Sequence, residues 1–140
     1  MSKYSLDDLR VRACRRAALA LHSYWEEGSG AHTRLFETLV PDEYVVSGVS
    51  IKGGWYREHV VPCKVIRDHC FELCAQGASV EDVAAFIQAH LKIVFITPEE
   101  AEHLNVRMKL KTKMPAGWAV GDDVMARLAA AGISITNTRT

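Results

Sequence analysis

One short stretch of the chain constrains the fold most, because it has the pattern of a buried strand that leads straight into a helix. Residues 93–96 are Ile-Val-Phe-Ile, and β-branched and aromatic side chains favour a strand. Thr97, Pro98 and Glu100 then supply an N-cap, a first-turn proline and the glutamate of a capping box. The pattern predicts a helix that begins at this point, so the chain must combine sheet and helix.

Apolar side chains recur at helical spacing on both sides of this junction. The spacing predicts helices over residues 6–26, 31–39 and 122–131, and two more within residues 64–91. Extended runs are predicted over residues 45–51 and 55–61, joined into a hairpin through Gly53 and Gly54, with a short strand over residues 133–135. We therefore expect an α+β fold in which a small β-hairpin and a further strand are surrounded by several helices.

The length and composition are those of an ordinary globular domain. The chain has 140 residues, of which 49% are hydrophobic and 24% charged, so it can bury a core of its own. We expect a single domain over residues 1–140, with a helical part at 1–40, a core at 44–110 that carries a helical insertion at 64–91, and a C-terminal part at 111–140. Lys and Arg number 17, as do Asp and Glu, so the global charge neither supports nor excludes a nucleic-acid partner.

Export and membrane insertion are not expected from this sequence. Residues 1–12 lack an apolar core, and no later segment is long enough and free enough of charge to span a bilayer. The cysteines are Cys14, Cys63, Cys70 and Cys74, with no CxxC pair. Together with His69, the last three could form a zinc site, but buried reduced thiols are the favoured interpretation. We therefore expect a cytoplasmic protein with no membrane partner.

The pentapeptide EHVVP at residues 58–62 places an imidazole beside a carboxylate at the end of an extended run. It resembles the signature of the HNH endonucleases, the ββα-metal nucleases. In that family the histidine ends the first strand of a hairpin, an irregular insertion follows, and a second strand leads into a helix with metal ligands. The resemblance implies that residues 93–98 form the second strand, residues 99–109 the helix and residues 64–91 the insertion.

The resemblance implies a metal-dependent endonuclease that hydrolyses DNA phosphodiester bonds. That reaction requires a base to activate water and a cation to neutralise charge on the phosphoryl oxygens. His59 would be the base, because an imidazole titrates near neutral pH. The candidate metal ligands are Glu58, His103 and Asn105, and they would hold one divalent ion, Mg²⁺, Mn²⁺, Ni²⁺ or Zn²⁺.

This ligand set departs from the family pattern in two ways. The family places Asn or His ligands about four residues apart on the helix, but the residue four before Asn105 is Ala101. In addition, Glu58 and His59 are adjacent, and successive side chains of a strand point to opposite faces. The two could share one site only at a strand end or a bulge.

Basic side chains gather in two windows of the sequence. Their members are Arg107, Lys109, Lys111 and Lys113 in one window, and Arg10, Arg12, Arg15 and Arg16 in the other. If the first window is extended, its four charges face one side. Together with Arg57, that window is the candidate contact to a DNA backbone, because phosphate contacts supply sequence-independent affinity. An ordinary solvated face is at least as good an interpretation of either window alone.

Other functions remain open. The main alternative is a catalytically inactive HNH-like binding protein, for example a small phage-type regulator or inhibitor that acts on nucleic acid or on a nuclease complex. A structural subunit of an oligomer is a third, and it would leave an apolar face of the opening helix uncovered. Trp55, Tyr56 and Trp118 could stack on bases, but aromatic side chains in a hairpin or beside a turn usually pack as core.

Overall fold

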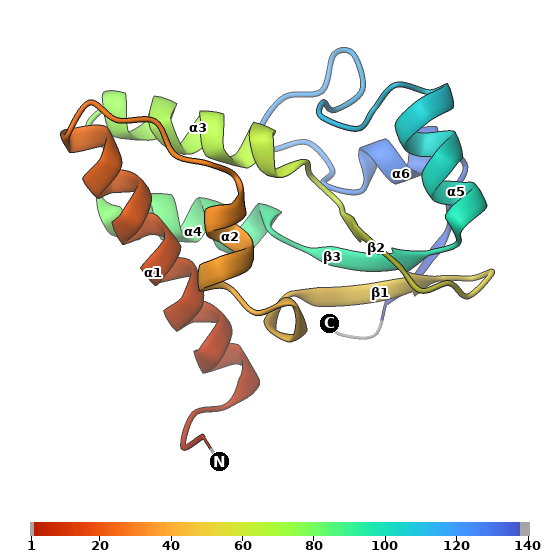
Figure 1. Ribbon diagram of the computed structural model, residues 1–140, viewed down its shortest axis with the longest axis horizontal. Coiled ribbons are helices and arrows are strands. Elements are labelled where there is room, and N and C mark those ends of the chain that lie inside the picture. The colour runs from red at the N-terminus through yellow and green to blue at the C-terminus, as the bar shows by residue number, and fades with distance from the viewer. Residues whose placement is uncertain (1, 138–140) are drawn as a thin grey trace. The chain divides into compact units, whose positions relative to one another are not determined.

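The computed structural model describes residues 2–137, and these residues confirm an α+β fold (Figure 1). The chain divides into two compact units, each of which is built from two segments. Unit 1 comprises Met1–Val45 and Ile66–His90, and unit 2 comprises Val46–Val65 and Leu91–Thr140. Most of the predicted insertion therefore belongs to the same unit as the N-terminal helices.

Unit 1 is helical, and its helices lie where the apolar spacing predicts them. They are α1 (Leu6–Glu26), α2 (Arg34–Leu39), the short 3-10 helix η1 (Asp42–Tyr44), most of α3 (Cys63–Ala75) and α4 (Val80–His90). The Ser5 hydroxyl caps α1 by accepting a hydrogen bond from the Asp8 amide at 3.1 Å. The buried side of α1 packs along α4 (Figure 1).

Helix α1 also carries partly exposed apolar side chains. Its large apolar side chains with exposed fractions of 40–45% are Leu6, Val11, Leu19, Tyr24 and Trp25. At about 3.6 residues per turn these five side chains spread over more than half of the helix circumference, so they do not form the single uncovered face that the structural-subunit alternative predicts. No helix within residues 2–137 has both the length and the apolar character needed to cross a membrane.

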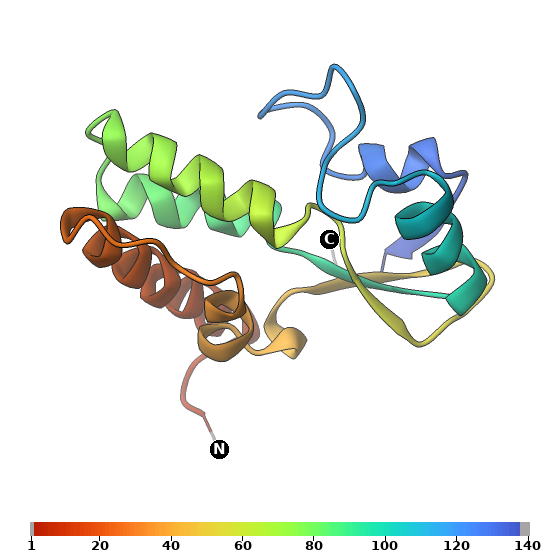
Figure 2. The same ribbon diagram turned by 45° about the horizontal axis from the view of Figure 1, so that its top comes forward.

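Unit 2 contains a mixed four-stranded sheet. The strands are β1 (Val46–Ser50), β2 (Tyr56–His59), β3 (Ile93–Ile96) and β4 (Ile135–Asn137). Their order is β2-β3-β1-β4. The central strand β3 runs antiparallel to β2 and parallel to β1, and β4 runs antiparallel to β1 (Figure 2).

The predicted hairpin between the first two extended runs is wrong, because β3 lies between β1 and β2. The turn that joins β1 to β2 crosses the end of β3 instead of folding β2 back onto β1. Gly54, with φ +125°, allows this crossing, since a Cβ there would lie 2.2 Å from the carbonyl carbon of Ile96. A turn residue with a side chain could not approach β3 so closely.

The junction after β3 confirms the predicted strand-to-helix start. The Thr97 hydroxyl accepts from the Glu100 amide at 3.1 Å, and the Glu100 carboxylate accepts from the Thr97 amide at 2.9 Å. The helix over residues 99–109 forms as two pieces, α5 (Pro98–Glu102) and the π-helical turn η2 (His103–Arg107). The last helix, α6 (Ala126–Ala130), is shorter than predicted and lies on the same side of the sheet as α5 (Figures 1 and 2).

Candidate functional site

The segment that carries the HNH resemblance lies in unit 2, where β2 pairs with β3 and β3 leads into α5. The pairing of β2 with β3 is regular over all four residues of β2, without a bulge. Side chains of Glu58 and His59 therefore point to opposite faces of the sheet. Glu58 is buried, whereas His59 is half-buried at the last position of the strand. The two side chains consequently do not converge on one site.

Glu58 takes part in a buried polar cluster centred on Arg127 of α6. The Arg127 side chain is 2% exposed, and its Nη2 donates to Glu58 Oε1 in a salt bridge. The same nitrogen donates to Asn105 Oδ1 at 2.9 Å, and Asn105 Nδ2 donates to Glu58 Oε2 at 3.4 Å. Glu58, Asn105 and Arg127 thus form a closed triangle, which we call the Arg127 cluster.

The Arg127 guanidinium also holds the main chain on either side of this triangle. Nη1 donates to the carbonyl of His59 at 2.7 Å, and Nε donates to the carbonyl of Leu110 at 2.5 Å. A planar guanidinium carries five donors in a fixed arrangement, so one side chain joins the end of β2 to the chain that follows η2. Within residues 2–137, every buried side-chain nitrogen and oxygen has a hydrogen-bond partner.

The two ligand candidates on η2, His103 and Asn105, are two residues apart. Asn105 faces the Arg127 cluster, and residues two apart on a helix do not share a side. His103 therefore points to a different side of η2 from Asn105, and both residues are half-buried. The structure brings Glu58 and Asn105 together, and it brings neither His59 nor His103 to them.

As arranged, Glu58 and Asn105 do not fit a divalent metal ion. Both Glu58 oxygens and the Asn105 oxygen accept hydrogen bonds within the cluster, and the charge between them is that of a guanidinium. A second cation placed there would be repelled at short range. Within the part of the chain that the structure describes, no three His, Cys, Asp or Glu side chains form a group that could hold a metal ion.

Arg127, the central residue of this cluster, is not among the residues predicted from the sequence. One signal points to it: Arg127 is the only charged residue between positions 124 and 138, and residues 124–133 are otherwise apolar or glycine. A charge in such a run is buried only when it is paired. Its partners, however, lie 22 and 69 positions away in the sequence.

The basic window at residues 107–113, which we call the basic segment, is not extended. Arg107 belongs to η2 and Lys109 adopts a left-handed conformation with φ 58°, so the predicted one-sided stripe does not form. Arg107 pairs with Glu102 at 3.4 Å. Lys109, Lys111 and Lys113 are exposed, and none of them has an ion-pair partner among residues 2–137. Leu110 and Met114 are buried beside them.

The other basic candidates have partners. Arg57 is half-buried on β2, opposite Phe95 of β3. The four arginines of the other basic window lie on α1 and make contacts within unit 1. Arg10 pairs with Asp7, and Arg15 pairs with Glu81. Arg12 lies over the Tyr4 ring, and Arg16 donates a hydrogen bond to the Leu39 carbonyl. These four arginines therefore form an ordinary solvated surface whose side chains contact neighbouring residues of unit 1.

The neutral total charge conceals an uneven division between the units. Unit 2 contains ten Lys and Arg residues and six Asp and Glu residues, a formal charge of +4, and unit 1 carries −4. Within unit 2, Glu58 and Glu100 are buried and hydrogen-bonded, so their charges are not on the surface. The surface of unit 2 is thus predominantly basic.

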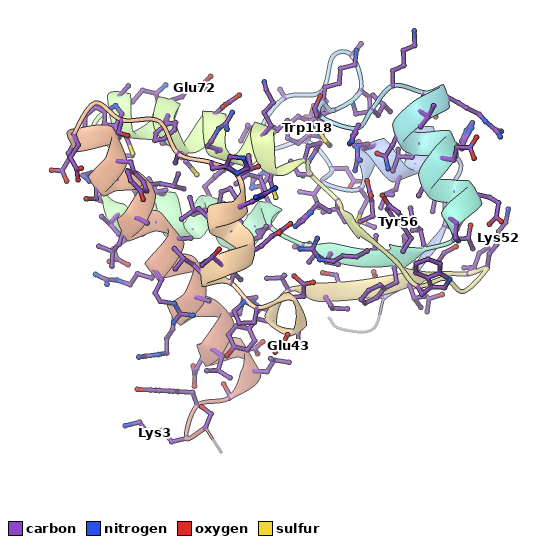
Figure 3. All side chains as sticks on the ribbon, viewed as in Figure 1. Lys3, Glu43, Lys52, Tyr56, Glu72 and Trp118 are labelled. Carbon is purple, nitrogen blue, oxygen red and sulfur yellow. The ribbon has the colours of Figure 1, made fainter. Side chains whose placement is uncertain are left out.

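Two aromatic candidates differ in their surroundings. Trp55 follows the turn between β1 and β2 and is 75% exposed, so its interpretation as core is wrong. Trp118 is half-buried in the loop before α6, and its indole nitrogen donates to the Asp123 carbonyl at 2.8 Å. Figure 3 shows Lys52 on the turn and Trp118 on the loop. The turn is therefore an exposed aromatic and basic feature of unit 2.

The cysteines behave as thiols. All four are free, and Cys14, Cys70 and Cys74 are buried. Burial raises the pKa of Cys14 to about 11 and that of Cys70 to about 12, and burial also raises the pKa of Cys74. Because thiolates bind metals and react as nucleophiles, these three cysteines are poorly suited to either role.

The candidate site of this chain therefore consists of the Arg127 cluster and the exposed basic segment that follows η2. Arg127 and Glu58 of the cluster are buried and Asn105 is half-buried, and their side-chain oxygens already accept hydrogen bonds, whereas the basic segment is accessible to a partner. Comparison with protein-family models, with curated proteins and with solved structures finds no match to this chain.

Proposed function

We propose that this chain is a DNA-binding protein built on an HNH-like ββα arrangement and that it binds DNA without cleaving it. The observation that carries this proposal is the Arg127 cluster. Glu58 and Asn105, two of the three candidate metal ligands, are bound to Arg127, which supplies the positive charge that a metal would otherwise supply. Resemblance in fold does not require that chemistry be retained.

The charge of unit 2 supports DNA as the partner. Its excess of four positive charges includes Lys109, Lys111 and Lys113, which are exposed and lack ion-pair partners in residues 2–137. Cations of this kind bind phosphates and release counterions, which gives affinity without sequence readout. The basic segment is therefore the proposed contact to the DNA backbone.

A metal-dependent endonuclease is the second candidate function. The arrangement of β2, β3 and α5, with His59 as the last residue of β2, favours it. In this alternative His59 would activate water, and a divalent ion would have to displace Arg127 from Glu58 and Asn105 or use other ligands.

One experiment distinguishes the two functions. Purified protein is incubated with supercoiled plasmid and Mg²⁺, Mn²⁺, Ni²⁺ or Zn²⁺, with EDTA and His59→Ala as controls. We expect retarded migration of the plasmid without nicking, in EDTA as in metal. Nicking that requires a metal and is lost in both controls would overturn the binding proposal in favour of the endonuclease. Absence of both retardation and nicking would overturn both.

A further inference from the structure

We infer that Arg127 is a positioning residue that fixes the basic segment in its DNA-binding conformation, an inference that rests on the proposed function. Arg127 is almost entirely buried and cannot itself touch DNA. Its Nε, however, donates to the carbonyl of Leu110, the residue between Lys109 and Lys111. A buried side chain thus holds the main chain at the centre of the basic segment.

The other end of the guanidinium is attached to ordered parts of unit 2. Nη1 donates to the His59 carbonyl at the end of β2, and Nη2 donates to Glu58 and Asn105. Since the guanidinium is planar and rigid, these bonds fix its position and the direction of Nε. Arg127 therefore ties the Leu110 carbonyl to β2 and η2, in addition to the hydrogen bond that the Leu110 amide donates to Leu104.

The basic segment needs such an attachment because its own backbone provides little order. The chain leaves η2 through Lys109, whose backbone is in the left-handed region. That conformation costs a residue with a side chain about 1–2 kcal/mol. From Leu110 to Met114 the chain is in neither a helix nor a strand. The Leu110 amide donates to the Leu104 carbonyl at 3.2 Å, and the Leu110 side chain is buried.

Fixing this segment favours binding because a mobile loop must lose conformational entropy when it meets a ligand. A segment held in place before binding avoids that loss and presents Lys109, Lys111 and Lys113 at fixed positions. A role of Arg127 in stability alone would not predict this local effect. The two roles differ in whether the three lysines become mobile while the protein stays folded.

The direct test compares Arg127→Lys with the wild type. Lysine keeps a positive charge for Glu58 but lacks the fork that reaches Leu110 and His59 at once. We expect trypsin to cleave the folded variant after Lys109, Lys111 and Lys113 about tenfold faster than the wild type. We also expect its Kd for duplex DNA, measured by fluorescence anisotropy, to rise by about tenfold.

Ile96→Val is the matched control, because it removes a methylene from a fully buried side chain of β3 that has no part in the Arg127 cluster. At equal folded fractions, the control should cleave and bind like the wild type. If Arg127→Lys does not fold, Glu58→Gln combined with Arg127→Gln removes both charges and the bond to Leu110. The same changes in cleavage and Kd are then expected of the double variant.

The outcomes separate this inference from the proposed function. Wild-type cleavage rates and Kd in the folded Arg127 variant would overturn the positioning role, even if the wild type binds DNA well. An equal change in Ile96→Val would also overturn it, since lower stability alone would then be sufficient. If the wild type does not bind DNA, the proposed function fails, and unchanged trypsin cleavage would still count separately against the positioning role.

Discussion

At the scale of single residues, the arginine that bonds Glu58 and Asn105 decides how this site is interpreted. Glu58 and Arg127 form a buried salt bridge, and Arg127 makes three further hydrogen bonds. A buried ion pair of this kind adds little to stability when compared with well-packed apolar residues, but removing one partner leaves an uncompensated charge. The cluster therefore acts mainly through the arrangement that it imposes.

We predict that Glu58→Gln lowers the free energy of unfolding by about 3–5 kcal/mol, because Arg127 stays buried with its charge unpaired. Urea denaturation followed by circular dichroism measures this change. Glu102→Gln is the matched control: it breaks the exposed pair with Arg107, whose side chains are 66% and 60% exposed, and should change stability by less than about 1 kcal/mol. Equal effects of the two substitutions would contradict the account of the cluster.

Part of the site can be predicted from single residues, and part cannot. The pentapeptide EHVVP and Asn105 can be singled out from the sequence. Glu58 and Asn105 belong to the Arg127 cluster, and the carbonyl of His59 accepts a hydrogen bond from Arg127. Arg127 carries only a weak signal, because its role depends on partners that are distant in the sequence. The separation of His59 from Glu58 and of His103 from Asn105 follows from local spacing, because neighbours on a strand and residues two apart on a helix point to different sides.

At the scale of secondary-structure elements, the turn between β1 and β2 fixes the order of the sheet. Gly54 lies against the backbone where β3 ends and α5 begins. Ser50 at the end of β1 donates to the buried Glu100 carboxylate at 2.9 Å, which links the same turn to the first turn of α5. The turn is thus attached to both strands and to the helix.

We predict that Gly54→Ala destabilises the protein by more than about 2 kcal/mol, because its Cβ would overlap the Ile96 and Thr97 backbone at a strained φ. Gly53→Ala is the matched control, since its φ is +79° and a Cβ there would meet no atom within 4 Å. It should lose only about 1 kcal/mol from the backbone conformation. Denaturation of both variants measures the difference, and equal losses would mean that close approach to β3 is unimportant.

The elements themselves are largely predictable from the sequence, but their pairing is not. Caps at Ser5, Ser79 and Thr97 mark helix starts within one residue or two of those observed. These signals are local, because each depends on side chains within a single turn. Strand pairing depends on contacts between distant segments, so the adjacent runs around Gly54 suggested a hairpin that β3 interrupts.

At the scale of the whole molecule, charge and burial are distributed differently in the two units. Unit 1 carries a charge of −4 and three buried cysteines, and unit 2 carries +4 and the exposed basic segment. Neither property is visible in the total composition, which is neutral. A neutral chain can therefore offer a basic surface to a polyanion.

We predict that alkaline pH destabilises the fold through the buried thiols. Burial raises the pKa of Cys14 to about 11 and that of Cys70 to about 12, from an ordinary 9.0. The native state therefore keeps these protons where the unfolded chain releases them, so their contribution is complete below pH 9 and is lost as pH rises toward 11 and 12. Between pH 9 and 11 we expect a loss on the order of 1–2 kcal/mol per thiol.

Denaturation of the wild type and of Cys14→Ala at pH 8, 9, 10 and 11 checks this prediction. The variant lacks one buried thiol, so its free energy of unfolding should fall less steeply above pH 9. Groups common to both proteins cancel in the comparison. Parallel curves would show that Cys14 ionises equally in both states.

The most direct test of the central claim is the salt dependence of DNA binding. Fluorescence anisotropy with a labelled duplex at several salt concentrations is compared for the wild type and for Lys109→Gln/Lys111→Gln/Lys113→Gln, whose changes are confined to exposed side chains. Each lost phosphate contact reduces the slope of log K against log salt by about 0.9, so we predict a slope lower by about 2.7 and weaker binding throughout. Equal slopes and affinities for the two proteins would contradict the claim that the basic segment of unit 2 binds DNA.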